Sequence, residues 1–135
     1  MEIVFDTNVL VSGLLQPKSA PGEIIDLVFG EAVTPVFDDR ILYEYRDVLV
    51  RPKFAFPLYI VEDLLNAITT IGRQVIAVHT SISLPDENDR CFYECALTTS
   101  SQTLVTGNKK HFPAHKCPAI RVFSPREFLE GLEKK

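Results

Sequence analysis

The stretch Glu2-Ile3-Val4-Phe5-Asp6-Thr7-Asn8 decides how the chain is built. Residues 2–5 are mostly apolar, with β-branched and aromatic side chains, and predict a short buried strand that ends at Asp6. The next three residues supply turn and cap chemistry, and residues 9–15 continue as a short helix. The chain therefore opens with a buried strand that runs directly into a helix.

The same alternation of strand and helix continues to the end of the chain. It predicts an α/β fold with a central, mostly parallel sheet flanked by helices on both faces. With 135 residues, no linker and no internal repeat, we expect a single domain over residues 1–135. Further strands are expected at 32–37, 74–79, 103–105 and 120–123, and further helices at 22–29, 39–50, 59–71, 88–100 and after the capping-box sequence Ser124-Pro125-Arg126-Glu127.

Composition favours a cytoplasmic globular protein. Hydrophobic residues make up 46% of the chain, enough for a real core and too many for a disordered tail. No apolar run reaches the roughly 18 residues of a membrane span, and the first residues lack the features of a signal peptide. Cys91, Cys95 and Cys117 are odd in number and lack the spacing of a disulfide framework, which favours reduced thiols.

The formal net charge of −4 limits how the chain could bind nucleic acid. Proteins that simply coat nucleic acid are usually basic. Binding to RNA or DNA would therefore rest on a local basic patch, on metal ions or on a partner. Arg90, Lys109 and Lys110 adjoin the polar groups described next, and they are the preferred phosphate contacts.

Two polar residues stand at the carboxyl ends of expected strands, where open parallel sheets bind their ligands. Asp6 directly follows the first strand, although an acid there could also be an ordinary helix cap. Asn108 follows the strand at 103–105 through Thr106-Gly107, where an ordinary turn would also explain it. Both residues are candidates for a site at this edge of the sheet.

Two acids lie on the apolar sides of expected helices. Asp89 projects onto the middle of the apolar stripe of its helix, where a carboxylate costs free energy unless it is paired or binds a cation. Glu44 lies at the edge of such a stripe, beside Val48. The ordinary alternatives are a first-turn acid stabilised by the helix dipole, with Asp86 as the cap, and a solvated flank for Glu44.

One acidic metal site would explain these groups together. Oxygen ligands suit Mg²⁺ or Mn²⁺, and such ions polarise a phosphodiester and generate hydroxide at neutral pH. Zinc is the alternative, because histidines and cysteines gather in the same part of the chain, but they form no CxxC pair. The residues concerned are Cys91, Cys95, His111, His115 and Cys117.

Four motifs, in order along nearly the whole chain, resemble those of PIN-domain proteins. The second resembles that of one bacterial and archaeal branch of the family. The motifs are Phe5-Asp6-Thr7-Asn8-Val9-Leu10-Val11-Ser12; Ile41-Leu42-Tyr43-Glu44-Tyr45-Arg46-Asp47-Val48-Leu49 with Arg51-Pro52-Lys53-Phe54; Pro85-Asp86-Glu87-Asn88-Asp89 with Ala96-Leu97; and Leu104-Val105-Thr106-Gly107-Asn108 with Phe112-Pro113.

The resemblance implies a PIN fold and a Mg²⁺- or Mn²⁺-dependent endoribonuclease. Many relatives in this branch are classed as toxins of toxin–antitoxin pairs, similar to VapC, which would give the chain RNA as substrate and an antitoxin as partner. By motif match, Asp6, Glu44 and Asp89 would be the catalytic metal ligands, with Asp86 assisting. Groups that support the ligands or face the phosphate would be Thr7, Asn8, Ser12 and Thr106.

The chain departs from many of these relatives at Asn108, where they carry an acid. An asparagine offers a metal only a neutral oxygen, so we expect one ion to bind well and a second ion poorly. The departure also keeps open a second function, a catalytically weak or inactive PIN domain that binds RNA or protein. A phosphotransferase of the haloacid-dehalogenase type is disfavoured, because its motif needs an acid at Asn8. We further expect a homodimer.

Overall fold

A computed structural model describes residues 1–133 of the chain. The five strands are β1 (Glu2–Phe5), β2 (Thr34–Phe37), β3 (Arg73–Gln74), β4 (Thr103–Val105) and β5 (Arg121–Phe123). The α-helices are α1 (Thr7–Leu15), α2 (Ala20–Phe29), α3 (Asp39–Leu49), α4 (Leu58–Ile71), α5 (Arg90–Thr98) and α6 (Pro125–Glu133). Three single 3-10 turns are η1 (Pro52–Phe54), η2 (Glu87–Asp89) and η3 (Lys109–His111).

The strands form one sheet in the order β3-β2-β1-β4-β5, and every pairing is parallel. The first strand lies in the middle, where Glu2 pairs with Thr34 on one side and Val4 with Leu104 on the other. Because all strands run the same way, their carboxyl ends share one edge of the sheet. The predicted parallel α/β sheet is therefore confirmed, and Asp6 stands at the centre of that edge.

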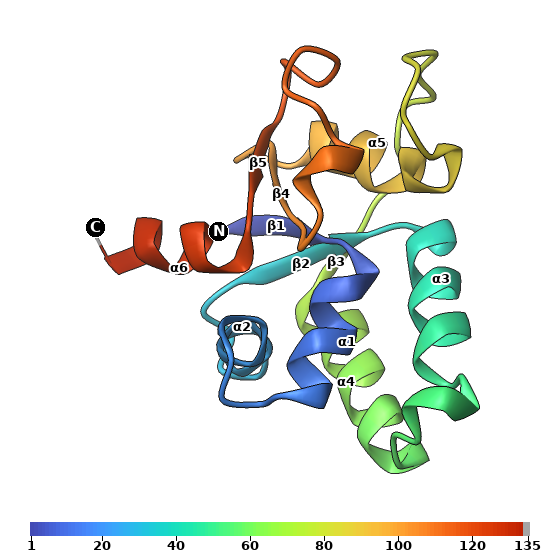
Figure 1. Cartoon of the computed structure of the whole chain (residues 1–135), viewed down its shortest axis with the longest axis vertical. Helices are drawn as coiled ribbons and strands as arrows, with labels where there is room; N and C mark the ends of the chain where they lie inside the picture. The colour runs from blue at the N-terminus through green and yellow to red at the C-terminus, as the bar shows by residue number, and fades with distance from the viewer. Residues whose placement is uncertain (134–135) are drawn as a thin grey trace.

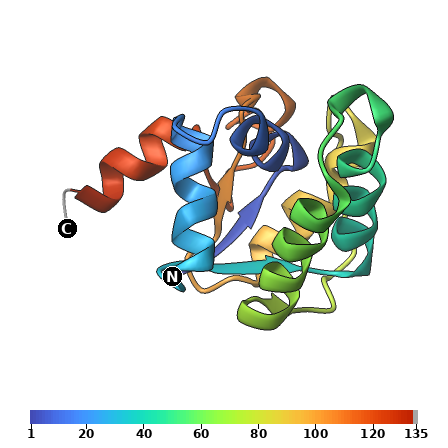
Figure 2. The same cartoon turned by 90° about the horizontal axis from the view of Figure 1, so that it is seen from below.

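Helices cover both faces of the sheet, as predicted. In Figure 1, α5 lies on one face while α1, α2 and α4 lie on the other, and α6 extends beside β5. Figure 2 shows α2 and α4 from below, lying across the same side of the sheet. The apolar side chains between these layers form a continuous buried core. Within residues 1–133, no helix is long and apolar enough to cross a membrane.

Cap residues fix where the helices begin. Ser19 accepts a hydrogen bond from the backbone N–H of Gly22 and so caps α2, and Asp38 caps α3 through the N–H of Ile41. At α6 the capping box is reciprocal, because the N–H of Glu127 donates to Ser124 Oγ and the N–H of Ser124 donates to the Glu127 carboxylate. The expected final helix thus begins where its sequence predicts.

Two predicted elements are shorter than expected. The strand at 74–79 is reduced to Arg73–Gln74, because the chain leaves the sheet edge after Val75, whose N–H still donates to Phe37, and runs toward α5. The helix expected at 88–100 begins at Arg90, after the turn η2. At the start of α5 the cause is local, because Asp86 caps the turn η2 through the N–H of Asn88. Asp89 therefore lies in a turn rather than inside a helix.

Candidate functional site

Asp6 lies at the junction of β1 and α1, but its side chain does not cap the helix. Its Oδ2 instead accepts a hydrogen bond of 2.7 Å from Thr106 Oγ1, which follows β4 on the neighbouring strand. Thr106 is fully buried, and its Oγ1 also accepts from the backbone N–H of Asn108 at 3.0 Å. The adjacency of β1 and β4 thus fixes the orientation of the Asp6 carboxylate.

Asp89 is buried with an unsatisfied oxygen. Only 8% of the residue is exposed, and Oδ2 has no hydrogen-bond partner among the described residues. The ring nitrogen Nδ1 of His111 lies 2.8 Å from this oxygen, within ion-pair distance, and the contact lowers the pKa of Asp89. An acceptor left this way costs free energy in the absence of a further partner.

Glu44, on α3, is half-buried and faces the same hollow as Asp6 and Asp89. This hollow, here called the acidic pocket, has a volume of about 260 Å³. It collects one carboxylate from the first strand end, one from α3 and one from η2, which the sequence separates widely. The remaining walls of the acidic pocket are Thr7, Asn8, Val11, Val48, Phe54, Phe92 and His111.

The three carboxylates are poised to favour a positive charge between them. Burial raises the pKa of Asp89 to about 6, with a further contribution from the charge of Asp6, while His111 opposes the shift. Burial also raises the pKa of Asp6, although the Thr106 hydrogen bond counters part of the effect. The pKa of Glu44 is raised as well, mainly by burial. A bound cation would relieve these costs.

The donor chemistry of the acidic pocket fits a hard divalent ion, although its three carboxylates do not converge on one point. Within residues 1–133, no three His, Cys, Asp or Glu side chains stand close enough together to hold a metal ion without moving. The unsatisfied Oδ2 of Asp89 and the hydroxyl of Thr7, which is buried without a partner, still leave oxygen atoms available. Asp6, Glu44 and Asp89 are the residues that would hold the ion.

The supporting residues expected from the sequence lie in different places. Thr7 and Asn8 line the acidic pocket, and Asn8 Oδ1 accepts from the N–H of Gly107 at 3.1 Å, tying α1 to the turn after β4. Ser12 is exposed one turn along α1 and is not part of the pocket wall. Asp86 caps η2 through the N–H of Asn88, outside the wall, and its charge raises the pKa of Asp89.

Asn108 and His111 form a connected pair that sequence reasoning did not recognise. The turn η3 brings His111 back beside Asn108, with Nδ2 of the amide 3.0 Å from Nε2 of the ring. The Asn108 side chain thus meets the imidazole and is not among the pocket-lining residues, whereas His111 is. The spacing of three residues across a turn after a strand end was the available signal. The sequence suggests His111 only as a zinc ligand together with the cysteines, whose thiols are buried.

The three basic residues proposed as phosphate contacts differ in their partners. The guanidinium of Arg90 donates to the backbone oxygens of Thr80 and Ile82 and pairs with Glu87, so it is engaged within the protein. Lys109 forms an exposed ion pair with Glu127 at 2.9 Å. Lys110 is exposed and has no ion pair among residues 1–133. Of the three basic residues, Lys110 is therefore the one most available to contact a phosphate group of a bound nucleic acid.

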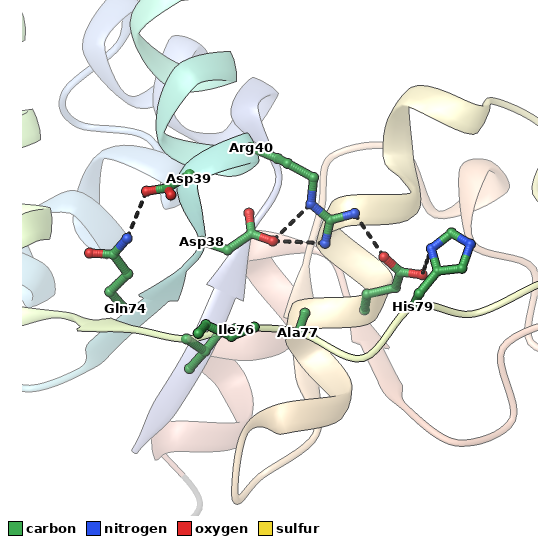
Figure 3. Close-up of a pocket in the computed structure, with 9 residues that line it drawn as sticks. Asp38, Asp39, Arg40, Gln74, Ile76, Ala77 and His79 are labelled. Carbon is green, nitrogen blue, oxygen red and sulfur yellow. Dashed lines mark hydrogen bonds and ion pairs between the residues drawn. The ribbon is translucent and has the colours of Figure 1, made fainter.

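A second hollow of about 270 Å³ lies beside β3 and differs in kind from the acidic pocket (Figure 3). At its centre Arg40 bridges Asp38 and Glu94 with contacts of 2.7 and 2.8 Å. Glu94 is almost fully buried and also accepts from the N–H and hydroxyl of Thr80. Burial alone would raise the pKa of Glu94, but these hydrogen bonds outweigh it and lower the pKa. The charges here are satisfied, which is typical of a structural network.

Comparison with known proteins agrees with this architecture. The chain matches the PIN domain family over residues 2–110, and it therefore belongs to that family. It is also 27% identical over 146 residues to the uncharacterized protein MJ1680 of Methanocaldococcus jannaschii, with 99% of this chain and 93% of that protein covered. PIN domains are generally nucleases that bind nucleic acid and typically use divalent metals, which supports a nuclease-type hydrolase at the coarse level.

Proposed function

We propose that the chain is a Mg²⁺- or Mn²⁺-dependent endoribonuclease that hydrolyses RNA phosphodiester bonds. The observation that carries the proposal is the buried, unsatisfied Oδ2 of Asp89, which faces the same pocket as Asp6 and Glu44. A buried carboxylate whose one nearby cationic group within residues 1–133 is a histidine, beside two other carboxylates of raised pKa, is best explained by a cation that it binds.

Each side chain has a definable task in this chemistry. Asp6, Glu44 and Asp89 would hold the divalent ion, which when bound polarises the phosphate and supplies hydroxide at neutral pH. Thr106 holds the Asp6 carboxylate in place. Thr7 lines the pocket, and its hydroxyl, which has no hydrogen-bond partner among residues 1–133, would donate to a phosphate oxygen. Asp86, just outside the pocket, adds negative charge that strengthens attraction for the cation.

An aromatic wall offers a place for a nucleotide base. Phe54 lines the acidic pocket and stacks on Phe56, with ring centroids 5.5 Å apart and an angle of 12° between the planes. Lys53 lies over the Phe54 ring at 5.1 Å. Because bases stack on aromatic side chains while phosphates meet cations, this arrangement suits a flexible single strand whose phosphate lies at the carboxylates.

The proposal is tested by incubating labelled RNA and DNA oligonucleotides with the protein and Mn²⁺, Mg²⁺ or EDTA. We expect RNA cleavage that EDTA stops. Asp6→Asn and Asp89→Asn should lower the cleavage rate by more than about 100-fold. A loss of that size exceeds what is usual when a residue that only supports a metal ligand is replaced. The matched control is Asp63→Asn, an exposed carboxylate on α4, which should cut like the parent. Equal activity in all four proteins would place the site elsewhere.

The alternative is a PIN domain that binds RNA or protein without turnover. It is favoured by the neutral Asn108, whose side chain contacts His111 instead of offering a fourth carboxylate. The same experiment separates the two functions, because such a module would retard RNA in a gel yet leave it intact with every metal. Cleavage that depends on Asp6 would reject the alternative.

We further propose a homodimer and, if the chain is a toxin, an antitoxin that covers the acidic pocket with basic side chains. Support for a protein contact comes from large exposed apolar residues on and next to α3 and α4, since such groups often mark interfaces. Light scattering should give twice the mass of the 135-residue chain; a monomer at high concentration would remove the dimer. The apolar residues are Tyr43, Val50, Leu58 and Tyr59.

A further inference from the structure

The contact between His111 and Asp89 has the separation that two neighbouring ligands of one ion would have. Nδ1 and Oδ2 are 2.8 Å apart, yet Oδ2 has no hydrogen-bond partner among the described residues. Ligands at about 2.1 Å from an octahedral ion stand about 3 Å from each other. The imidazole is also accessible, because 36% of its side chain is exposed while that of Asp89 is 11% exposed.

We propose that His111 is a nitrogen ligand of the divalent ion, beside Asp89, and that the acidic pocket therefore selects Mn²⁺ over Mg²⁺. This inference rests on the proposed metal-dependent function and adds the identity of the ion to it. Mg²⁺ takes oxygen ligands almost alone, whereas imidazole favours first-row transition ions. Within residues 1–133 these side chains do not yet converge, so they would have to close around the ion. The three carboxylates and one imidazole would then form a ligand set that is no longer purely oxygen.

Asn108 then acquires a role as the residue that orients the imidazole. A histidine that binds a metal through one ring nitrogen usually donates the other N–H to an oxygen. The Asn108 amide stands 3.0 Å from Nε2, and turning it over would present Oδ1 in place of Nδ2 at nearly the same position. Nε2–H would donate to that oxygen and leave the lone pair of Nδ1 for the ion. The neutral Asn108 is thus a partner of His111, not a ligand.

The competing explanation is a simple ion pair, in which His111 only offsets the charge of Asp89. Pulsed electron paramagnetic resonance of the Mn²⁺-loaded protein separates the two, because a directly bound imidazole gives a ¹⁴N modulation and a carboxylate does not. Calorimetric titration with MnCl₂ and, separately, MgCl₂ gives the two affinities. The variant is His111→Gln, and the control is His115→Gln, an exposed histidine in the same loop.

We expect a ¹⁴N signal in the parent and in His115→Gln, and none in His111→Gln. His111→Gln should weaken Mn²⁺ binding by about tenfold or more while changing Mg²⁺ binding far less. Absence of the ¹⁴N signal from a parent that binds Mn²⁺ and cuts RNA would overturn this inference alone, as would an equal loss of affinity for both ions. A parent that binds neither ion at millimolar concentration would overturn the proposed function with it.

Discussion

Asp89 and Glu94 show, at the scale of the single residue, how one short segment can hold two carboxylates with opposite effects on stability. Asp89 faces the acidic pocket with an unsatisfied oxygen and a raised pKa, whereas Glu94 is enclosed by Arg40 and Thr80 and has a lowered pKa. A buried carboxylate that is left without partners so that it can bind a ligand lowers the free energy of unfolding, whereas one that is fully paired raises it.

Asp89→Asn should therefore stabilise the metal-free protein at pH 7–8, by about 1–2 kcal/mol. Since the folded pKa of about 6 lies above the ordinary value of 3.8, the folded state binds the extra proton between these limits. The cost of Asp89 is complete above pH 6 and disappears as the pH falls toward 4. Urea unfolding in EDTA should show the advantage of the variant shrinking over that window. An advantage independent of pH would contradict this account.

Glu94→Gln should do the opposite and destabilise the protein at neutral pH by about 2 kcal/mol, because Arg40 and the backbone of Thr80 lose a charged acceptor. The pKa of Glu94 is lowered, so its contribution is present above the ordinary value of 4.5 and is lost as the pH falls through the folded pKa. Thermal unfolding of parent and variant at pH 7, and then at successively lower pH to well below 4.5, measures this. The outcome that counts against it is a variant as stable as the parent at pH 7.

The sequence was enough to single out the acidic residues as candidates, but not to show which side chains contact them. Asp6 and Asp89 could be singled out because a strand end and an apolar stripe are visible in a pattern of residues. That Thr106 donates to Asp6, or that His111 meets Asp89, depends on two loops that meet only after the sheet has formed. When two hydrogen-bond partners are separated by a hundred residues, no pattern in the sequence around either residue indicates the contact.

At the scale of elements, the predictions succeeded where a helix or strand is decided by its own residues. The capping box at Ser124 and the buried run at Glu2–Phe5 are examples. They failed for residues 75–79, whose β-branched residues favour a strand but whose course is set by Arg90 and Glu94 on α5. Ile76 and Val78 remain exposed as a result. Propensity is a weak guide when tertiary contacts compete with it.

The packing of α1 on α2 gives a test at this scale. A Cβ added at Gly13 would stand 2.5 Å from Ile25 Cδ1 and 2.9 Å from the backbone oxygen of Pro21, so the two helices would have to move apart. Gly13→Ala should cost about 1–2 kcal/mol, because overpacking exceeds the gain in helix propensity. The control is Gly131→Ala in α6, where a Cβ meets nothing within 4 Å.

Gly131→Ala should be neutral or stabilising by up to about 1 kcal/mol, since only the helix propensity changes. Denaturation midpoints in urea compare both variants with the parent. If Gly13→Ala proves as stable as Gly131→Ala, then α1 and α2 are less closely packed than their contact indicates.

At the scale of the whole molecule, the proposed metal binding would be coupled to folding. Its carboxylates come from β1, α3 and η2, so the ligands assemble only in the folded chain. An ion that binds the native state alone stabilises it by about 2.7 kcal/mol at a hundredfold excess over Kd. The melting temperature should rise by about 5–10 °C with saturating Mn²⁺.

Asp6→Asn should abolish that rise, while Asp63→Asn should keep it. Differential scanning calorimetry with and without EDTA makes the comparison. If millimolar Mn²⁺ leaves the melting temperature of the parent unchanged, the chain has no competent metal site. If the melting temperature rises equally in Asp6→Asn, the ion binds away from the acidic pocket.

The sheet order has a consequence for the time at which the acidic pocket is assembled. Of the five strands, β1 is synthesised first, yet it lies in the middle of the sheet. Its neighbour β4 is synthesised about a hundred residues later, and only then can Thr106 donate its hydrogen bond to Asp6. A nascent chain on the ribosome carries Asp6 and Glu44 long before it carries Asp89 and His111. If the chain cuts RNA as proposed, a nascent chain cannot cut the messenger from which it is being translated until the residues up to His111 have left the ribosome.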